Sequence, residues 1–438
     1  MLKSPLLLFI AAVFCAARST PAAGQEDFSR PQHETAFEFS ISQEFGENAK
    51  PAIVVTTSIP YRRLIFFMRG ERYEARYRVY FELKDTHGKR VRGDVWEESV
   101  ATGSFRETTS AALAAVSRRT FPAVAGEYHA TVTIEVIDTS RRFTEEQALR
   151  VVGEGMGRLE LSSPVFYTQT GDSLSPKPRD GEIEVSACSS PAAGTARINP
   201  GAVYGSLDGW ARIVCSLVTP AAGGGTPFAV TARVRDARGI IVLYARRTFD
   251  RVEGGHASIC LDINVDGFVL GEYEVEAIAE TPDGAQKSEA GGRFTVIFNR
   301  ALLGARIGDL VEILSIVADE KEARLIEDAP PAERMQAWAA FWRKRDPTPS
   351  TETNEAFDEF LQRLKYVLAN LSKHQPGWRT DMGKIYIKNG APDKVEDRQD
   401  EHTAAYYRLW YYYSKGIAYV FEDVIGSGEY RLLTTEMI

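Results

Sequence analysis

Seven charged residues in the last third of the chain are the ones best suited to chemistry. They are Arg343, Arg345, Asp346, Glu355, Arg379, Asp381 and Asp393. If they met in one cleft, carboxylates beside arginines would form a polar binding site, and two acids could act as general acid and base.

A structural interpretation competes with this one. Asp346 precedes a proline, where it can close a turn or cap a helix. Asp381 can satisfy backbone groups of its own turn, and arginine–aspartate pairs commonly tie segments together. We favour the structural interpretation. We therefore predict no catalytic residue and keep the seven, together with Trp378, as candidate binding residues.

The common catalytic and metal signatures are missing from the sequence. It has no HExxH, GxSxG, Walker or Rossmann motif in a suitable setting, and the glycine-rich run 153–157 stands between strand patterns. There is no CxxC pair, and the six histidines are scattered, so we predict neither a metal site nor a cofactor. His374 is the one histidine near a motif, and without a nucleophile it is weak evidence for catalysis.

Apolar residues at helical spacing predict three helices that would position these charges. The period of the pattern changes from two to about 3.6 after Arg300. The three apolar stripes are Leu310/Leu314/Val317/Ala318, Met335/Trp338/Phe341/Trp342 and Phe357/Phe360/Leu361/Leu364/Val367/Leu368/Leu371. Between the second and third stripes, Pro347 and Pro349 predict a stiff, extended connector.

A small antiparallel sheet should follow the helices. Gly377–Asp381 is interpreted as a turn, Gly383–Ile387 as a strand and Asn389–Asp393 as a glycine/proline turn. Aromatic and apolar residues then alternate through strands that begin near Trp410 and end near Leu432. Trp378 and Trp410 are expected in the core, because aromatic side chains bury the most area per residue.

These motifs together resemble the GWxTD domain, a family found in exported bacterial proteins. The resemblance rests on FWRKRDPTP…NE, GWRTD at 377–381, IYI-x-x-G-x-PD, and the closing W-x-Y…GI-x-YVF-x-D…G-x-Y, in the family's order across residues 305–438. It implies a bacterial, exported protein, and it implies no established activity.

Before this region apolar and polar residues alternate with a period of two, which predicts strands with one buried face. Leu83-Lys84-Asp85-x-x-Gly88-x-x-Val91 is similar to Val234-Arg235-Asp236-x-x-Gly239-x-x-Val242, and Gly126-Glu127-Tyr128 to Gly271-Glu272-Tyr273. We therefore predict two antiparallel β-sandwich modules of immunoglobulin-like type, at 36–160 and 161–300, followed by the α+β domain at 305–438.

The N-terminus is typical of a secretory signal. Lys3 precedes a short apolar run, and small residues before Gln25 predict cleavage near Gly24. A lipoprotein anchored through Cys15 is the alternative that we favour less. No other segment is apolar enough to span a bilayer, so we expect a periplasmic or secreted protein without a transmembrane span in its mature form.

Cleavage would leave three cysteines. Cys188 with Cys215 is the predicted disulfide, since both lie in one candidate module, although other pairings and buried free thiols stay open.

Three functions fit these observations to different degrees. The 438 residues are 44% hydrophobic with a net charge of −8, which indicates a folded protein and gives no basic footprint for nucleic acid. The favoured function is non-enzymatic binding or assembly in the cell envelope, with a protein or peptide partner. The alternative is a hydrolase or transferase that acts on envelope material through the Arg/Asp/Glu cluster. Carbohydrate binding by the sandwiches is a third, weaker option.

Overall fold

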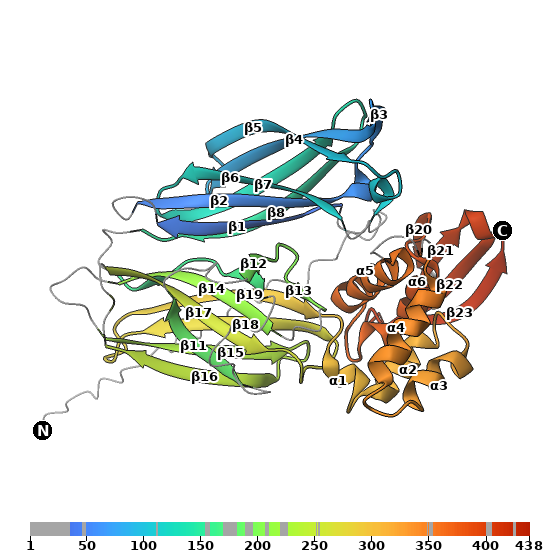
Figure 1. The fold of residues 1–438 in the computed structure, drawn as a ribbon. Coiled ribbons are helices and arrows are strands. Elements are labelled where there is room, and N and C mark those ends of the chain that lie inside the picture. Colours follow the sequence, from blue (N-terminus) through green and yellow to red (C-terminus); the bar gives the residue numbers. More distant parts are fainter. Residues whose placement is uncertain are drawn as a thin grey trace, which may run out of the picture.

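The computed structural model describes residues 36–45, 50–110, 113–153, 158–169, 182–188, 196–205, 210–219, 227–250, 252, 255–347, 349, 354–399, 405–423 and 426–438. The predicted signal sequence, Cys15 and most of the proline-containing connector fall outside this part of the chain. The described residues form mostly antiparallel sheets, with α-helices in the C-terminal part (Figure 1). No helix among them has the length and apolar character needed to cross a membrane.

The first strand-rich part packs two sheets around one core. One sheet has the order β1–β2–β6, formed by β1 (Glu38–Phe45), β2 (Pro51–Pro60) and β6 (Ala114–Pro122). The other has the order β3–β4–β7–β8, with β5 also on β4, formed by β3 (Phe67–Arg69), β4 (Arg72–Asp85), β5 (Arg90–Thr102), β7 (Gly126–Val136) and β8 (Arg142–Val151). The side chains of β4 alternate between the two faces of its sheet. Tyr77 and Val79 lie in the core, whereas the preceding Arg76 is exposed to solvent.

The second strand-rich part is also a pair of sheets with its own core. The first sheet runs β11–β17–β14–β10–β12, with β9 on β14: β9 (Glu160–Leu161), β10 (Val165–Gln169), β11 (Ile183–Cys188), β12 (Ala196–Ile198), β14 (Trp210–Val218) and β17 (His256–Asn264). The second runs β13–β19–β18–β15–β16: β13 (Val203–Tyr204), β15 (Phe228–Asp236), β16 (Ile241–Phe249), β18 (Gly271–Glu280) and β19 (Lys287–Val296).

The repeated sequence motif makes the same turn in both parts. The Asp85 carboxylate accepts hydrogen bonds from the backbone of His87 and Lys89, each at 2.9 Å. The carboxylate of Asp236 accepts the equivalent bonds, each at 3.0 Å, from Arg238 and Ile240. A glycine with φ of +78°, where a side chain would be strained, follows three residues after each aspartate.

The predicted disulfide is wrong. Cys188 is bonded to Cys260, and Cys215 is a buried free thiol. Cys188 and Cys260 lie on the neighbouring strands β11 and β17, where Cys188 is opposite Ser258 and Ser186 opposite Cys260. Cys215 is on β14, next to β17, but it faces the main core whereas Cys260 faces the other side of the sheet. Strand register, which the sequence does not reveal, therefore decides the pairing.

The C-terminal part combines helices with an antiparallel sheet. Its described elements are α1 (Arg300–Leu303), α2 (Ile307–Leu314), α3 (Glu320–Glu327), α4 (Arg334–Arg345), α5 (Glu355–Asn370), α6 (Asp381–Asn389), β20 (Lys394–Gln399), β21 (Tyr406–Tyr412), β22 (Ile417–Asp423) and β23 (Arg431–Met437). The sheet has the order β20–β21–β22–β23 and is antiparallel, as predicted.

Two sequence predictions fail here. The described residues hold six α-helices rather than three, because α1, α3 and α6 were missed. The strand predicted over Gly383–Ile387 is part of α6. Its alternating Ile385 and Ile387 imitate a strand, but the Thr380 side chain caps the helix by accepting a hydrogen bond from Gly383 N–H at 2.9 Å.

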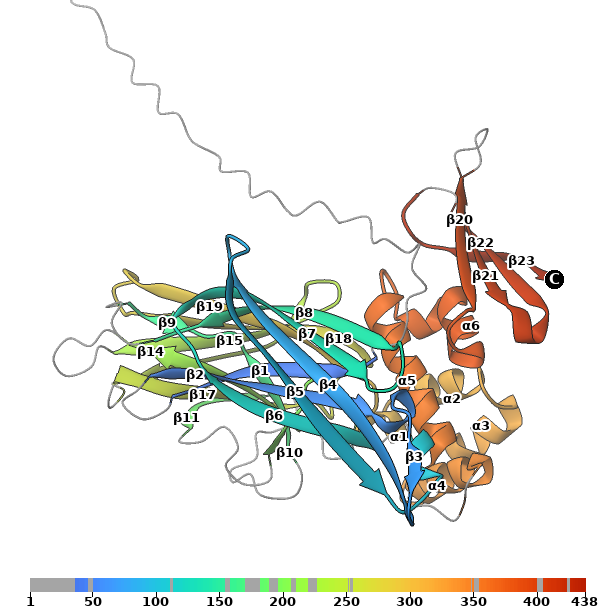
Figure 2. The same ribbon diagram turned by 90° about the horizontal axis from the view of Figure 1, so that it is seen from above.

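The three parts touch one another (Figures 1 and 2). Ser216 Oγ of β14 donates to the Gln43 carbonyl of β1 at 3.4 Å, and the rings of Phe45 and His256 lie 4.6 Å apart. Helix α5 lies against β18 and β19, and its Lys365 pairs with Glu38 of β1. Helix α5 of the C-terminal part therefore contacts both strand-rich parts.

Candidate functional site

The two glycines around the GWRTD run permit close backbone packing. Gly377 opens the 3₁₀ helix η5 (Gly377–Arg379), where a Cβ would lie 2.1 Å from the Val367 carbonyl oxygen. At Gly383, in the first turn of α6, a Cβ would lie 1.9 Å from the Gly377 carbonyl oxygen. Both separations are far below van der Waals contact, so any side chain at either position would push α5, η5 and α6 apart.

Trp378 is a core residue, as expected. It is 2% exposed and belongs to the cluster that includes α4 and α5. The guanidinium of Arg379 lies 4.5 Å from the centre of its ring. Arg379 also donates to Asp309 at 3.0 Å and to Glu312 at 3.1 Å, both on α2. The tryptophan and arginine together tie the turn to the helical layer.

Thr380 and Asp381 bind the turn to itself and to the sheet. Thr380 Oγ1 donates to the Gly377 carbonyl oxygen at 2.7 Å in addition to capping α6. One carboxylate oxygen of Asp381 accepts a hydrogen bond from Leu432 N–H of β23 at 2.9 Å. Asp381 also lies in the first turn of α6, where a negative charge is favourable.

The candidate residues at the end of α4 contact that helix or its neighbour α3. Arg345 stacks on Phe341, with 3.7 Å between its guanidinium and the ring centre, and it forms an ion pair with Glu322 of α3. Asp346 is the C-cap residue of α4, and Arg343 is exposed.

The remaining candidates act at element ends. Glu355 lies in the first turn of α5, which Asn354 caps by accepting from Phe357 N–H at 3.0 Å. The Asp393 carboxylate accepts from Tyr413 N–H at 2.7 Å and so fixes the turn into β20.

The structure does not bring the eight candidates together. Arg379 and Asp381 line a pocket of about 1180 Å³, whereas Arg345 lines a separate pocket of about 670 Å³ between the segment after α2 and helices α3, α4, α5 and α6. Trp378, Arg343, Asp346, Glu355 and Asp393 line neither. The single charged cleft that the sequence suggested is therefore not formed by the described residues.

The larger pocket lies where the GWRTD turn meets the sheet. Its wall comes from the end of α5 and the segment after it, from the start of α6, and from the ends of β20, β21 and β22 that meet the Gly426–Arg431 turn. The side chains that we missed in the sequence include Lys373, Asp397, Arg398, Tyr406, Tyr407, Arg408, Asp423, Tyr430 and Arg431.

An ion pair between the buried Arg408 and the exposed Asp397 lines this pocket. Arg408 donates two hydrogen bonds to Asp397, at 2.6 and 2.9 Å, and its guanidinium lies 4.7 Å from the ring centre of Tyr430. Burial raises the pKa of the Tyr430 hydroxyl. Asp423 accepts hydrogen bonds from the backbone N–H groups of Ser427 and Gly428, which holds the glycine turn over the pocket.

A sequence signal for this pocket did exist. Tyr406, Arg408, Trp410 and Tyr412 alternate on β21, and Trp410 and Tyr412 belong to the core beneath the helices. Arg408 is the one charged residue on this otherwise aromatic face of β21, which packs toward the helices. A charge in such a position is expected to be buried and to need a partner of opposite charge. Register supplies that partner, because Arg408 is directly opposite Asp397 on β20.

No group of three or more histidine, cysteine, aspartate and glutamate side chains in the described ranges is arranged to hold a metal ion.

Comparison with known proteins identifies the C-terminal part. The chain matches no curated protein sequence. Among solved structures it is similar to a family 2 glycosyl hydrolase from Bacteroides cellulosilyticus, with 7% identity, TM-score 0.22 and coverage of 56% of this chain and 28% of that one. It is also similar to the C-terminal domain of the antigen I/II-family protein AspA from Streptococcus pyogenes, with 6% identity, TM-score 0.18 and coverage of 60% and 99%.

A third similar structure is dimeric latent PorU from Porphyromonas gingivalis, with 11% identity, TM-score 0.21 and coverage of 61% and 21%. The matched region thus spans little more than a quarter of the glycosyl hydrolase and about a fifth of PorU. At these TM-scores the similarities carry no conclusion about function. The profile of the GWxTD domain, in contrast, matches residues 286–434. The chain therefore carries a GWxTD domain, whose matched region begins just before β19 and ends within β23.

Proposed function

We propose that this chain is an exported envelope protein whose GWxTD domain binds a segment of a protein or peptide partner. The observation that carries the proposal is the pocket of about 1180 Å³ between the GWRTD turn and the sheet. Its volume exceeds that of most small-molecule sites, which favours a peptide segment as the occupant.

The side chains of the pocket support a binding role. Tyr406, Tyr407 and Tyr430 line it together with Arg398 and Arg431. Tyrosine and arginine are the residues enriched where protein partners bind most tightly, because each combines a large contact area with hydrogen-bonding groups. Tyr406 is 42% exposed, so its ring is accessible to a partner.

Three of the four carboxylates that line the pocket favour binding over acid–base chemistry. Asp397 is engaged by Arg408, Asp381 by Leu432 N–H, and Asp423 by the amides of the glycine turn. A general acid or base has to exchange a proton with a substrate. These three carboxylates instead accept hydrogen bonds from the protein itself and so hold the segments that form the pocket together.

The strand-rich parts are proposed to be two immunoglobulin-like modules that act as a spacer or as further binding surfaces. Tyr128, near the start of β7, donates to the carbonyl of Val124 at 2.9 Å, and Tyr273, near the start of β18, donates to Val269 at 2.7 Å. A tyrosine that bonds backward to the backbone at this corner recurs in immunoglobulin-like sandwiches.

An extracytoplasmic location is part of the proposal. The predicted signal sequence motivates it, and the Cys188–Cys260 disulfide supports it, because such bonds persist in oxidising compartments.

Affinity capture from a solubilised envelope fraction tests the function. The double variant Tyr406→Ser/Arg431→Glu should lose the partner that the unchanged chain retains. Tyr413→Ser is the matched control, since Tyr413 is 57% exposed on the same domain but does not line the pocket. If the pocket variant keeps every partner, the proposal is wrong.

A further inference from the structure

The smaller pocket of the C-terminal part, of about 670 Å³, has the size of a small-molecule site. It lies between the segment after α2 and helices α3, α4, α5 and α6. Its apolar lining includes Trp342, Phe360 and Ile387, whose exposed fractions are 6%, 5% and 0%. Because small-molecule sites combine an apolar wall with a few polar groups, the polar groups of this pocket indicate which ligand it accepts.

The indole N–H of Trp342 is buried and has no hydrogen-bond partner in the part of the chain that the structure describes. Its ring packs against those of Trp338, Phe357 and Phe360, and none of these side chains has an acceptor atom. A buried donor without an acceptor is costly, and the N–H of a buried tryptophan usually finds one. Since Trp342 lines the pocket, a ligand there can supply the missing acceptor.

Five of the six charged side chains that line the pocket already have partners in the protein. Arg345 forms an ion pair with Glu322. Arg363 forms one with Glu359 and also donates to two carbonyl oxygens at the end of α6, at 2.9 and 3.0 Å. Asp319 caps α3 by accepting a hydrogen bond from a backbone N–H of that helix at 2.9 Å. These five charges therefore hold the helices together and need no ligand.

Lys388 is the sixth charged residue and differs from the others. Its side chain is exposed in the last turn of α6, and no carboxylate of the described residues pairs with it. The pocket thus offers one donor without an acceptor and one cation without an anion. A carboxylate on the ligand satisfies both, because its oxygens accept hydrogen bonds and carry a negative charge.

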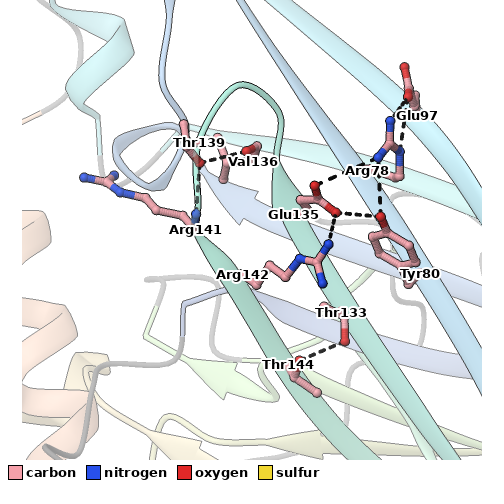
Figure 3. A network of polar contacts seen from close by, with 10 residues as sticks. All are labelled: Arg78, Tyr80, Glu97, Thr133, Glu135, Val136, Thr139, Arg141, Arg142 and Thr144. Atoms are coloured by element: carbon pink, nitrogen blue, oxygen red, sulfur yellow. Dashed lines mark hydrogen bonds and ion pairs between the residues drawn. The ribbon is translucent and has the colours of Figure 1, made fainter.

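The polar network on the outer face of β4 and β7 shows the contrasting case (Figure 3). There Arg78 bonds Glu97, and Glu135 accepts hydrogen bonds from Tyr80 at 2.5 Å and from Arg142 at 2.9 Å. Because these charges already have partners in the protein, that network does not call for a ligand.

We propose that the smaller pocket binds a small apolar monocarboxylate of about the size of a medium-chain fatty acid. The apolar body of the ligand packs on Trp342, Phe360 and Ile387, and burial of this area supplies most of the affinity. The carboxylate accepts a hydrogen bond from the Trp342 N–H, and Lys388 balances its charge. This site is separate from the larger pocket, so it adds a small ligand to the partner binding proposed for the GWxTD domain.

Titration calorimetry of the purified chain tests the proposal with octanoate as the probe. Octylamine has a similar apolar body, but its ammonium group has no acceptor atom and is repelled by Lys388. Octanoate should bind, and octylamine should bind roughly tenfold more weakly or not at all. The proposal is overturned if octanoate does not bind, or if octylamine binds equally well.

Substitutions locate the binding site. Lys388→Gln should weaken octanoate binding roughly threefold, because it removes an exposed ion pair with the ligand. Lys384→Gln is the matched control, since Lys384 is also exposed on α6 but does not line the pocket, and it should bind octanoate like the unchanged chain. Trp342→Phe keeps an aromatic ring without the N–H and should weaken binding roughly tenfold. Equal affinities of the two lysine variants would overturn the proposal.

The indole N–H resonances provide a second measurement that does not depend on a core substitution. The Trp342 resonance should move to higher frequency when octanoate binds, because a new hydrogen bond deshields the proton. Trp378 is the internal control, since its buried N–H also lacks a partner among the described residues but lines neither pocket. Its resonance should stay in place. If octanoate binds and the Trp342 resonance does not move, the proposed site is wrong.

Discussion

The Asp381 carboxylate and the Leu432 backbone N–H are joined by a hydrogen bond of 2.9 Å across 51 residues of sequence. The bond connects the start of α6 with the edge strand β23, so the last residue of the GWRTD run holds the helices onto the sheet. Asp381→Ala should lower the free energy of unfolding by about 1–2 kcal/mol, because it leaves the Leu432 N–H without this acceptor.

Asp381→Asn separates the hydrogen bond from the charge. Asparagine keeps an acceptor oxygen and loses only the interaction with the helix terminus, so the expected loss is about 0.5 kcal/mol. Urea unfolding of the two variants measures the difference. Equal losses, or no loss in Asp381→Ala, would contradict the role assigned to this hydrogen bond.

The glycines of the turn should be far less tolerant. Gly377→Ala and Gly383→Ala should each destabilise the domain by about 2–3 kcal/mol or more, because the new Cβ meets a backbone carbonyl oxygen. Gly308→Ala on α2 is the control, since a Cβ there meets nothing within 4 Å. It should be neutral or stabilising by up to about 1 kcal/mol, as expected for alanine in a helix. Thermal unfolding of the three variants gives the comparison.

The cysteines should differ in reactivity. Peptide mapping without reduction should recover Cys188 bonded to Cys260, and reduction should cost about 2–4 kcal/mol of stability because the bond closes a long loop. Burial raises the pKa of the Cys215 thiol to about 12, so this thiol should resist alkylation until the protein unfolds. A Cys188–Cys215 peptide, or rapid alkylation of native Cys215, would refute the assignment.

Asp358 should make stability depend on pH. Burial, and secondarily the nearby Glu355, raise the pKa of its carboxyl, while Arg62 opposes the shift. A raised pKa in the folded state means that the carboxyl stabilises the fold at low pH and that this contribution is lost as pH rises through the folded value. Asp358→Asn should therefore gain stability relative to the unchanged chain at pH 7, and the gain should shrink as the pH falls from the raised folded pKa toward the unfolded value of about 4. Denaturant midpoints across that range provide the measurement, and a gain that is independent of pH would contradict the assignment.

The sequence predicted most of the fold because burial patterns are local. Period-two alternation located strands such as β4 and β7, and apolar stripes located α2, α4 and α5. It failed for α6, where Ile385 and Ile387 imitate a strand and the deciding contacts are the Thr380 cap and the close approach at Gly383. Local pattern alone does not reveal such tertiary contacts.

The site was harder to predict than the fold for the same reason. Arg345 and Asp381 stand in neighbouring motifs but line different pockets. Arg408 meets Asp397 only through strand register, and Asp381 meets Leu432 only through the docking of α6 on β23. The motif identified the family, while the surface around it depends on contacts between distant segments.

Site-specific photo-crosslinking in the cell envelope tests the central claim most directly. A photoreactive amino acid replacing Tyr406, inside the pocket, should form a covalent adduct with one protein partner. The same amino acid replacing Tyr413, exposed on the same domain outside the pocket, should not. Adducts of equal yield at both positions, or none at Tyr406, would contradict the claim that the GWxTD domain binds its partner through this pocket.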